Sequence, residues 1–302
     1  MALLEATGLV KSFAGSRVVD GIDLSCERGE VLGVLGPNGA GKTTTLKMLY
    51  GFLTPQQGEI RYDGQEFAAH RYAIKRRIGV CAQEDTLDSE FDVRDNIRQM
   101  ARYFRPAVPE VEERIDELVA IFALGAHLEK KPDQLSGGLR RRLSIARAVV
   151  HQPSVLFLDE PTTGLDPEAR VGVWELISRL RAQGLAIVLT THYMDEAERL
   201  SDQLLVLKAG KVLAKGVPRD LLGRLLGEHV LVVRPPSDRQ AAMRAWLAAQ
   251  AAPPPATVLD EWRLCLTSQQ VGAFCLQFPD LKIHVREPDL DDLFLTLSRE
   301  VA

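Results

Sequence analysis

Apolar residues in the first 222 positions gather in short runs that alternate with stretches of helical spacing. Residues 31–36 (VLGVLG) predict a buried strand bounded by glycine. Residues 155–158 and 186–189 are apolar throughout, which is typical of parallel strands covered on both faces. The segment around 170–180 spaces its apolar residues as a helix does. Strands that alternate with helices predict a parallel α/β sheet.

Two regions of this first part depart from the alternation. Residues 1–30 read as short strands broken by Gly15, Gly21 and Gly29, which predicts an N-terminal antiparallel β part. From about residue 92 to 150 the pattern is mainly helical, with apolar residues such as Ile115 and Leu118 at helix spacing. We therefore expect an α/β core of mixed, mainly parallel sheet that carries a helical subdomain at about 92–150.

A change in composition after Gly223 marks a second domain. The predicted strands there are 229–233, 257–260, 262–266 and 281–285, and the predicted helices are 239–249, 269–278 and 290–298. The order βαββαβ plus one helix predicts a ferredoxin-like α+β module. The expected domains are thus 1–222 and 223–302. The last helix carries an apolar stripe, which must pack on its own module, on the first domain or on a second copy of the chain.

Length and composition fit two globular domains. The chain has 302 residues, 46% of them hydrophobic and 26% charged, with 37 Lys and Arg against 41 Asp and Glu. The net charge of −4 argues against nonspecific nucleic-acid binding, which favours a basic surface. The longest charge-free stretch, 264–279, is interrupted by polar residues, so we expect no membrane-spanning helix.

Nothing at the start of the sequence resembles a secretory signal, and none of the four cysteines forms a CxxC pair. We therefore expect Cys26, Cys81, Cys265 and Cys275 to be free, buried thiols in a reducing compartment.

The most specific local motif is GPNGAGKT, from Gly36 to Thr43. Glycines let the backbone wrap around an anion, and successive N–H groups at the start of a helix then bind phosphates. Lys42 is expected to reach the outer phosphates and Thr43 to ligate Mg²⁺. A glycine-rich turn that merely caps a helix is the alternative, but the predicted strand before it and helix after it favour nucleotide binding.

Two carboxylates end the run SVLFLDE at residues 154–160. The carboxyl edge of a parallel sheet is where such folds bind ligands. We expect Asp159 to hold Mg²⁺ through water and Glu160 to polarise the attacking water. The alternative is an ordinary solvated strand end.

Gln83 and His192 also follow predicted strands. Alone, a histidine after a strand is more often a structural residue than a functional one, and a lone glutamine is even less specific. Because Lys42, Gln83, Glu160 and His192 would meet at one sheet edge, we expect them to form one site.

The segment 135–148, LSGGLRRRLSIARA, resembles the signature of ATP-binding cassette (ABC) transporter ATPases. The order of motifs is similar too: GPNGAGKT, Gln83, LSGG, VLFLDE, TGLD and His192. Leu139 stands where the family usually has Gln, while Ser136, Gly137 and Gly138 are intact. The resemblance implies a P-loop ATPase core, with Asp166 at a dimer seam and Phe13 stacked on adenine. The alternative for Phe13 is a core position.

ATP and Mg²⁺ are the cofactors that the resemblance implies. The expected catalytic residues are Lys42, Gln83, Glu160 and His192, and the expected magnesium ligands are Thr43, Gln83 and Asp159. The residues expected to contact the nucleotide are Phe13, Gly36, Pro37, Asn38, Gly39, Ala40, Gly41, Lys42, Thr43, Thr44, Ser136, Gly137 and Gly138.

Ser136 can cap the helix that follows it, and that helix end is a second anion site. Two anion sites for one nucleotide make sense if two copies pack head to tail, with each ATP between the phosphate loop of one and Ser136 of the other. A capped helix and nothing more is the alternative. The run Arg140–Arg142 is expected to be a solvated or interdomain face.

A narrower resemblance is to the ATPases of ABC-2-type exporters, including the nodulation-signal and daunorubicin-resistance branches. It rests on DTLDSEFDVRDNI after Gln83, THYMDEAERL around His192 and EPDLDDLFLTL near the end. It implies a separate ABC-2-type membrane permease that docks near residues 84–96, a location at the cytoplasmic face of the membrane, and export of a small molecule, glycan or lipid.

Two other classes stay open at this point: a soluble ABC ATPase that acts on nucleic acid or ribosomes, and an importer ATPase. The short span between Lys42 and Ser136 leaves no room for the long coiled coil of repair ATPases, and the chain has one cassette. The helix and strand pattern of its tail differs from the β-barrel tail typical of sugar importers.

Overall fold

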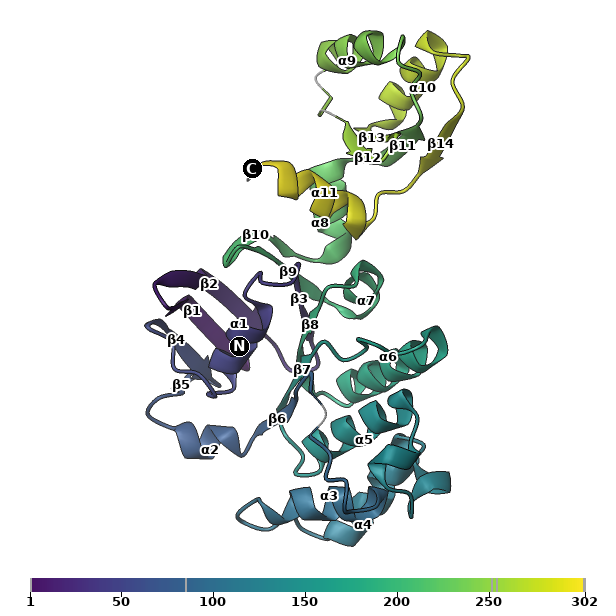
Figure 1. Ribbon diagram of the computed structural model, residues 1–302. Helices are drawn as coiled ribbons and strands as arrows, with labels where there is room; N and C mark the ends of the chain where they lie inside the picture. Colours follow the sequence, from purple (N-terminus) through teal and green to yellow (C-terminus); the bar gives the residue numbers. More distant parts are fainter. Residues whose placement is uncertain (1, 85, 251, 254, 301–302) are drawn as a thin grey trace. The chain divides into compact units, whose positions relative to one another are not determined.

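The computed structural model describes residues 2–84, 86–250, 252–253 and 255–300. The chain divides into two compact units, one ending at Lys215 and the other beginning at Gly216 (Figure 1). The division falls before helix α8 (Pro218–Leu226), earlier than the boundary expected after Leu222. The reason is that α8 packs against the terminal helix α11 (Leu290–Glu300), so it belongs to the second unit.

A six-stranded sheet with the order β10-β9-β3-β8-β7-β6 forms the centre of the first unit. Its strands are β3 (Val31–Leu35), β6 (Ile78–Cys81), β7 (Val155–Asp159), β8 (Ala186–Thr191), β9 (Gln203–Lys208) and β10 (Lys211–Gly216). The pairs β3–β8, β3–β9, β7–β8 and β6–β7 are parallel, as the apolar runs predict. Every residue of β3, β7 and β8 is buried, as expected for strands covered on both faces.

Alternate residues of β7 divide between two hydrophobic cores because side chains of a strand point to opposite faces. Leu156 and Leu158 pack with helices α3 (Val93–Arg102), α4 (Val111–Ile121), α5 (Gly137–Val149) and α6 (Pro167–Ala182). Val155 and Phe157 pack with α1 (Lys42–Leu49), α2 (Arg71–Lys75) and the N-terminal strands. The sheet therefore separates a helical part from a β part.

The N-terminal strands form a second sheet, with the order β2-β1-β4-β5 and antiparallel pairing throughout. Its strands are β1 (Leu4–Phe13), β2 (Ser16–Cys26), β4 (Gln57–Tyr62) and β5 (Gln65–Glu66). The antiparallel β part is confirmed, but Gly21 does not end a strand as expected. Gly8 and Gly21 adopt φ angles of +62° and +72° at shifts of register, so β1 and β2 continue through them as bulged strands.

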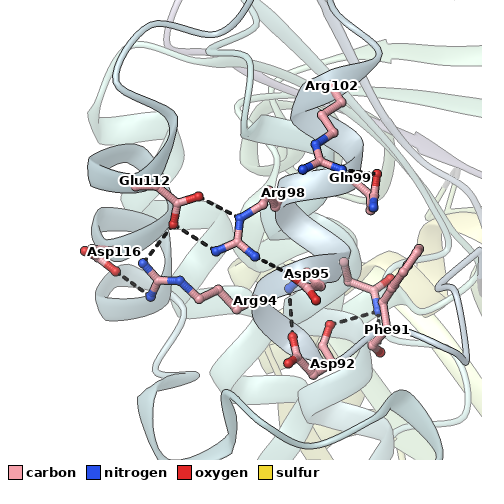
Figure 2. Close-up of polar contacts among 10 residues, drawn as sticks. Phe91, Asp92, Arg94, Asp95, Arg98, Gln99, Arg102, Glu112 and Asp116 are labelled. Atoms are coloured by element: carbon pink, nitrogen blue, oxygen red, sulfur yellow. Dashed lines mark hydrogen bonds and ion pairs between the residues drawn. The ribbon is translucent and has the colours of Figure 1, made fainter.

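Residues 92–150 are mainly helical, as predicted: they contain α3, α4 and α5, and the single turns η1 (Gly125–His127) and η2 (Pro132–Gln134) lie between α4 and α5. Ile115 and Leu118 of α4 are fully buried, as their spacing predicts. Arginines of α3 face acidic residues of α4 across the helix pair (Figure 2). A short helix α7 (Met194–Leu200) follows β8 and completes the first unit.

The second unit is an antiparallel sheet with the order β12-β13-β11-β14. Its elements are β11 (His229–Val233), α9 (Gln240–Ala249), β12 (Ala256–Val258), β13 (Glu261–Leu266), α10 (Ser268–Gln277) and β14 (Ile283–Arg286). This is the strand order of a ferredoxin-like module, so the predicted fold of the tail is confirmed.

The apolar stripe of the terminal helix is covered within the chain. Leu290, Leu293 and Leu297 are buried, and α11 packs on α8. Of the three places considered for this stripe, packing within its own module is therefore the one that the structure has.

Among the described residues, no helix has the length and apolar content needed to cross a membrane. None of the four cysteines forms a disulfide bond, as predicted. Cys26 and Cys81 are buried, whereas Cys265 and Cys275 are only partly buried, so the expectation of burial is correct for two of them.

Candidate functional site

The loop Gly36–Lys42 connects β3 to α1 and has room only for glycine at two positions. A Cβ on Gly36 would lie 2.4 Å from the carbonyl oxygen of Leu207. Gly41 has a φ of +99°, and a Cβ there would lie 2.6 Å from the carbonyl oxygen of Val18. No side chain caps α1 at Gly41, so the first N–H groups of the helix are left for a ligand. The loop thus has the backbone of an anion site.

Lys42 is buried with 5% of its surface exposed. Its Nζ donates to the carbonyl oxygens of Gly36 (2.9 Å) and Pro37 (3.2 Å) and lies 3.3 Å from Glu160 Oε1. A buried ammonium needs such partners because desolvation is costly for an unpaired charge. Lys42 is therefore held over the glycine loop, beside the carboxylate.

Asp159 is the last residue of β7, and two hydroxyls fix its carboxylate. Thr190 Oγ1, on the neighbouring strand β8, donates to Asp159 Oδ1 at 2.5 Å and accepts from the Glu160 backbone N–H at 3.0 Å. Thr43 Oγ1 donates to the same Oδ1 at 3.0 Å. Asp159 and Thr43, both expected to serve Mg²⁺, thus present oxygens side by side.

Glu160 gathers side chains from several elements around its carboxylate. Gln83 Nε2 donates to Oε2 at 3.3 Å and Thr163 Oγ1 donates to Oε2 at 3.1 Å. His192 Nδ1 lies 3.3 Å from the same oxygen, without the alignment of a hydrogen bond. Burial acts to raise the pKa of Glu160, but the charges of Lys42 and His192 outweigh it and lower the pKa. Glu160 is therefore a carboxylate at neutral pH.

These groups border one cleft of about 570 Å³. The cleft is lined by Val18, Asn38, Gly39, Ala40, Gly41, Lys42, Thr43, Thr44, Gln83, Glu160, Thr163 and His192. The structure therefore brings together the four residues that the sequence places at one sheet edge, next to the glycine loop.

The signature residues do not line this cleft. Ser136 caps α5 by accepting from the Leu139 N–H at 3.3 Å, as predicted. Gly138 allows α5 to approach α6, since a Cβ there would lie 2.8 Å from the Cβ of Ala169. Gly137 lines a neighbouring cavity of about 200 Å³ that it shares with Gln83 and Glu160.

Phe13 and Asp166 lie outside the cleft lining as well. Phe13 ends β1 with 45% of its surface exposed, so the core alternative for this residue is wrong. Its hairpin partner strand β2 contributes Val18 to the cleft. Asp166 caps α6 by accepting from the Ala169 N–H at 2.9 Å.

Arg141 was not expected at the site, because the run Arg140–Arg142 predicts a solvated or interdomain face. For Arg141 that prediction is wrong: its guanidinium donates to the backbone carbonyls of Ala82, Asp159 and Pro161, beside Gln83 and Glu160. No signal in a run of three arginines separates the inward one from its neighbours.

Glu196 is a second residue that sequence reasoning missed. Its carboxylate is fully buried and accepts from Thr162 Oγ1 (2.7 Å) and Trp174 Nε1 (3.0 Å). Glu196 lies on α7, directly after His192, while Thr162 follows Glu160. The hydrogen bond between Thr162 and Glu196 therefore joins the backbone after Glu160 to the helix after His192. A Glu in the first turn of an exposed-looking helix gives no sequence signal for such burial.

Comparison with known proteins identifies the family. A family model described as "ABC transporter" matches residues 19–163. The Nod factor export ATP-binding protein I of Paraburkholderia xenovorans (strain LB400) is 39% identical over 299 residues, which span 98% of this chain and 97% of that protein. This chain belongs to the ABC transporter ATPases. The protein of the same name from Ralstonia nicotianae (strain ATCC BAA-1114 / GMI1000) is 43% identical over 82% of this chain and 76% of its own length.

Solved ABC structures have the same fold as the first unit. A structure described as the ATP binding subunit of an ABC transporter aligns with a TM-score of 0.67 at 31% identity, over 74% of this chain and 93% of that one. The cbiO1 protein of Clostridium perfringens, part of the ABC transporter complex cbiONQ, aligns with a TM-score of 0.67 at 29% identity, over 73% of this ABC ATPase and 90% of its own chain. The chain is an ATP-binding and ATP-hydrolysing subunit of an ABC transporter, a class of subunit that works with membrane permeases.

Proposed function

We propose that this ABC ATPase works as a magnesium-dependent homodimer that powers export through a separate ABC-2-type permease at the cytoplasmic face of the membrane. The observation that carries the proposal is Glu160, a buried and ionised carboxylate between Lys42 and His192 at the mouth of the phosphate loop. It is the arrangement that an ATPase needs, with a base next to an anion site.

The residues of the cleft fit a nucleotide with its cation. The loop N–H groups and Lys42 would bind the phosphates. Thr43 and Asp159, whose oxygens lie 3.0 Å apart, would hold Mg²⁺ together with the amide oxygen of Gln83, because Mg²⁺ prefers oxygen ligands. When bound, Mg²⁺ would offset phosphate charge and so favour transfer of the terminal phosphoryl group.

Hydrolysis then depends on the groups around Glu160. Glu160 accepts the proton of the attacking water, and its lowered pKa keeps it ready to do so at neutral pH. His192 contacts the terminal phosphate from the opposite side of the carboxylate, and Gln83 orients Glu160 through its amide N–H. Phe13 offers an exposed ring for stacking on the adenine.

The homodimer rests on the position of the signature. Ser136 and Gly137 are exposed at the start of α5, yet they line no part of the cleft of their own chain. A head-to-tail pair brings the Ser136 end of one α5, with Gly137 and Gly138, to the ATP of the other copy. Asp166, which caps α6 next to this segment, then lies at the seam.

Export rests on the relatives. Proteins named as Nod factor export ATP-binding proteins match almost the full length of the chain, including the second unit. The described residues contain no membrane-spanning helix, so the path for the exported molecule belongs to a separate permease. That permease would dock near residues 84–96, and nucleic acid is not a partner in this proposal.

The Glu160→Gln variant tests the dimer and the base together. It should bind ATP, lose hydrolysis by about 100-fold or more, and form dimers in ATP and Mg²⁺ that light scattering detects. EDTA should prevent the dimers. Glu113→Gln, an exposed change on α4, is the matched control and should hydrolyse ATP normally. An inactive variant that stays monomeric in saturating ATP contradicts the dimer, and one that still hydrolyses ATP contradicts the role of Glu160.

Co-expression with a candidate ABC-2-type permease from the same genome tests the transport assignment. The ATPase should then move to the membrane fraction and copurify with the permease. Recovery with ribosomes or DNA instead would overturn the assignment to export.

A further inference from the structure

Arg141 lies on α5, just after the signature residues Ser136–Gly138, and its side chain reaches the end of two strands of the central sheet. Nη1 donates to the carbonyl oxygen of Ala82 at 2.6 Å. Nη2 donates to that of Asp159 at 3.0 Å, and Nε donates to that of Pro161 at 2.8 Å. Each of the three guanidinium nitrogens therefore donates a hydrogen bond to a different carbonyl oxygen.

These carbonyls belong to the backbone that positions two expected catalytic residues. Ala82 directly precedes Gln83, and Asp159 and Pro161 flank Glu160. Gln83 and Glu160 also bond to each other, at 3.3 Å. One side chain of the signature helix thus fixes both ends of this pair, and a shift of α5 must move or break its bonds to them.

The chemistry of arginine suits this task and that of lysine does not. The guanidinium is planar and holds its donors in fixed directions, whereas an ammonium is a point charge on a flexible chain. No carboxylate forms an ion pair with Arg141 among the residues that the structure describes, so its charge is balanced by backbone carbonyls. The three hydrogen bonds therefore depend on the planar arrangement of the guanidinium N–H groups and not on the positive charge alone.

The two neighbouring arginines make different contacts. Arg140 Nη1 donates to the carbonyl oxygens of Leu135 (2.8 Å) and Pro132 (3.5 Å), in the segment before the signature. Arg142 lies against α6, where its guanidinium fills the space beside Gly172. Arg140 also borders the cavity that Gln83 and Glu160 line, but the three hydrogen bonds to the backbone beside Gln83 and Glu160 come from Arg141.

We propose that Arg141 is a positioning residue that couples the two ATP sites of the dimer. This inference rests on the proposed head-to-tail dimer. In that dimer Ser136 acts on the ATP bound by the partner, whereas Gln83 and Glu160 act on the ATP of their own chain. Arg141 joins these groups within one chain, so ATP arriving at one site shifts α5 and, through Arg141, aligns Gln83 and Glu160 at the other.

The test compares Arg141→Lys with wild type in steady-state ATPase assays over a range of ATP concentrations. The wild type should show a Hill coefficient above 1. The variant should bind a fluorescent ATP analogue with unchanged affinity, because the phosphate loop is untouched, while its kcat falls about 10- to 100-fold and its Hill coefficient falls to 1. Arg114→Lys is the matched control, since Arg114 also donates to a carbonyl of α5, that of Val149, but far from the cleft.

A second variant separates positioning from folding. Arg141→Ala leaves space that opens on the cavity of about 200 Å³ lined by Gln83, Arg140 and Glu160. Millimolar guanidinium should therefore raise the kcat of this variant several-fold, which a loss caused by misfolding would not show. A folded Arg141→Ala protein that guanidinium does not activate counts against the proposal.

The outcomes keep this inference apart from the proposed function. If Glu160→Gln dimerises with ATP but Arg141→Lys keeps the wild-type kcat and Hill coefficient, the dimer stands and the role of Arg141 is wrong. A wild-type Hill coefficient of 1 also overturns the coupling. If Glu160→Gln never dimerises, both the dimer and the coupling fall.

Discussion

At the scale of single residues, the site is built around a buried ion pair. Lys42 and Glu160 are both at least nine-tenths buried, and their charged atoms lie 3.3 Å apart. Without nucleotide, each is a counterion for the other, so removal of either leaves a buried charge with fewer partners. Lys42 is also the residue that we propose binds the phosphates, so its charge would pair with Glu160 in the absence of nucleotide and with phosphate when ATP is bound.

Lys42→Ala should abolish ATP hydrolysis and weaken ATP binding about tenfold or more, because it removes a charge-assisted contact worth about 2 kcal/mol. Titration with a fluorescent ATP analogue and a phosphate-release assay measure the two effects. Lys47→Ala is the control: Lys47 lies on the same helix but is placed over the ring of Phe52. Unchanged turnover and affinity in Lys42→Ala would rule out this role.

Site residues at the ends of strands are easier to predict from the sequence than site residues on helices. Gln83 and His192 follow apolar runs, and the carboxyl edge of a parallel sheet brings such ends together. Arg141 and Glu196 lie on helices, where the direction of a polar side chain depends on tertiary neighbours rather than on spacing. Their hydrogen bonds to the segments beside Gln83 and Glu160 depend on how α5 and α7 pack against the rest of the first unit, and the local sequence does not show this packing.

At the scale of elements, α3 and α4 are joined by a network of charges (Figure 2). Arg98 donates to Glu112 at 2.6 and 2.9 Å and pairs with Asp95. Arg94 lies 3.1 Å from Glu112 and 2.7 Å from Asp116. Hydrogen bonds from Arg98 lower the pKa of Glu112 to about 2. Because the first residues of α3, including Arg94 and Asp95, lie within the segment 84–96 that is expected to contact a permease, this network helps to fix that segment against α4.

Glu112→Gln should lower stability at pH 7 by less than about 1 kcal/mol, since the side chain is half exposed and its pairs are screened by water. The folded pKa of Glu112 is below its unfolded value, so the stabilisation is complete above about pH 4.5 and is lost as the pH falls towards 2. Thermal melts at several pH values measure this. A deficit that stays constant from pH 7 to pH 2, or one that Glu113→Gln shares, would contradict it.

Helices and strands were predictable from the sequence where a single hydrophobic pattern dominates a segment. The βαββαβ order of the tail follows from alternating apolar segments, and the structure has the expected strand order. The course of the N-terminal strands was less predictable, because Gly21 was expected to break a strand and yet occupies a bulge within β2. The local sequence does not show whether the paired strand is long enough for the hydrogen-bonded ladder to continue beyond a bulge.

At the scale of the whole molecule, the chain has two units, and every residue of the cleft lies in the first. The boundary could not be placed from composition, because α8 follows the first unit without a break in pattern. What assigns α8 to the second unit is its contact with α11, a helix from the opposite end of that unit.

A chain that ends at Gly216 should therefore bind ATP as the full chain does, whereas a chain that ends at Leu226 should aggregate. The longer chain keeps α8 but loses α11, so the buried residues Leu221, Leu222 and Leu226 lose cover. Gel filtration and ATP titration of both truncated chains measure this. If the chain ending at Leu226 is the more soluble and stable of the two, α8 belongs with the first unit.

The four free cysteines have a practical consequence. Cys26 and Cys81 are buried in the first unit, and Cys265 and Cys275 lie in the second. Burial raises the pKa of Cys26 to about 12 and that of Cys265 to about 11, so both thiols resist alkylation while the fold is closed. Their labelling rates therefore report the opening of each unit separately. Cys81, two residues before Gln83, adds a native reporter of local opening at the edge of the sheet that borders the cleft.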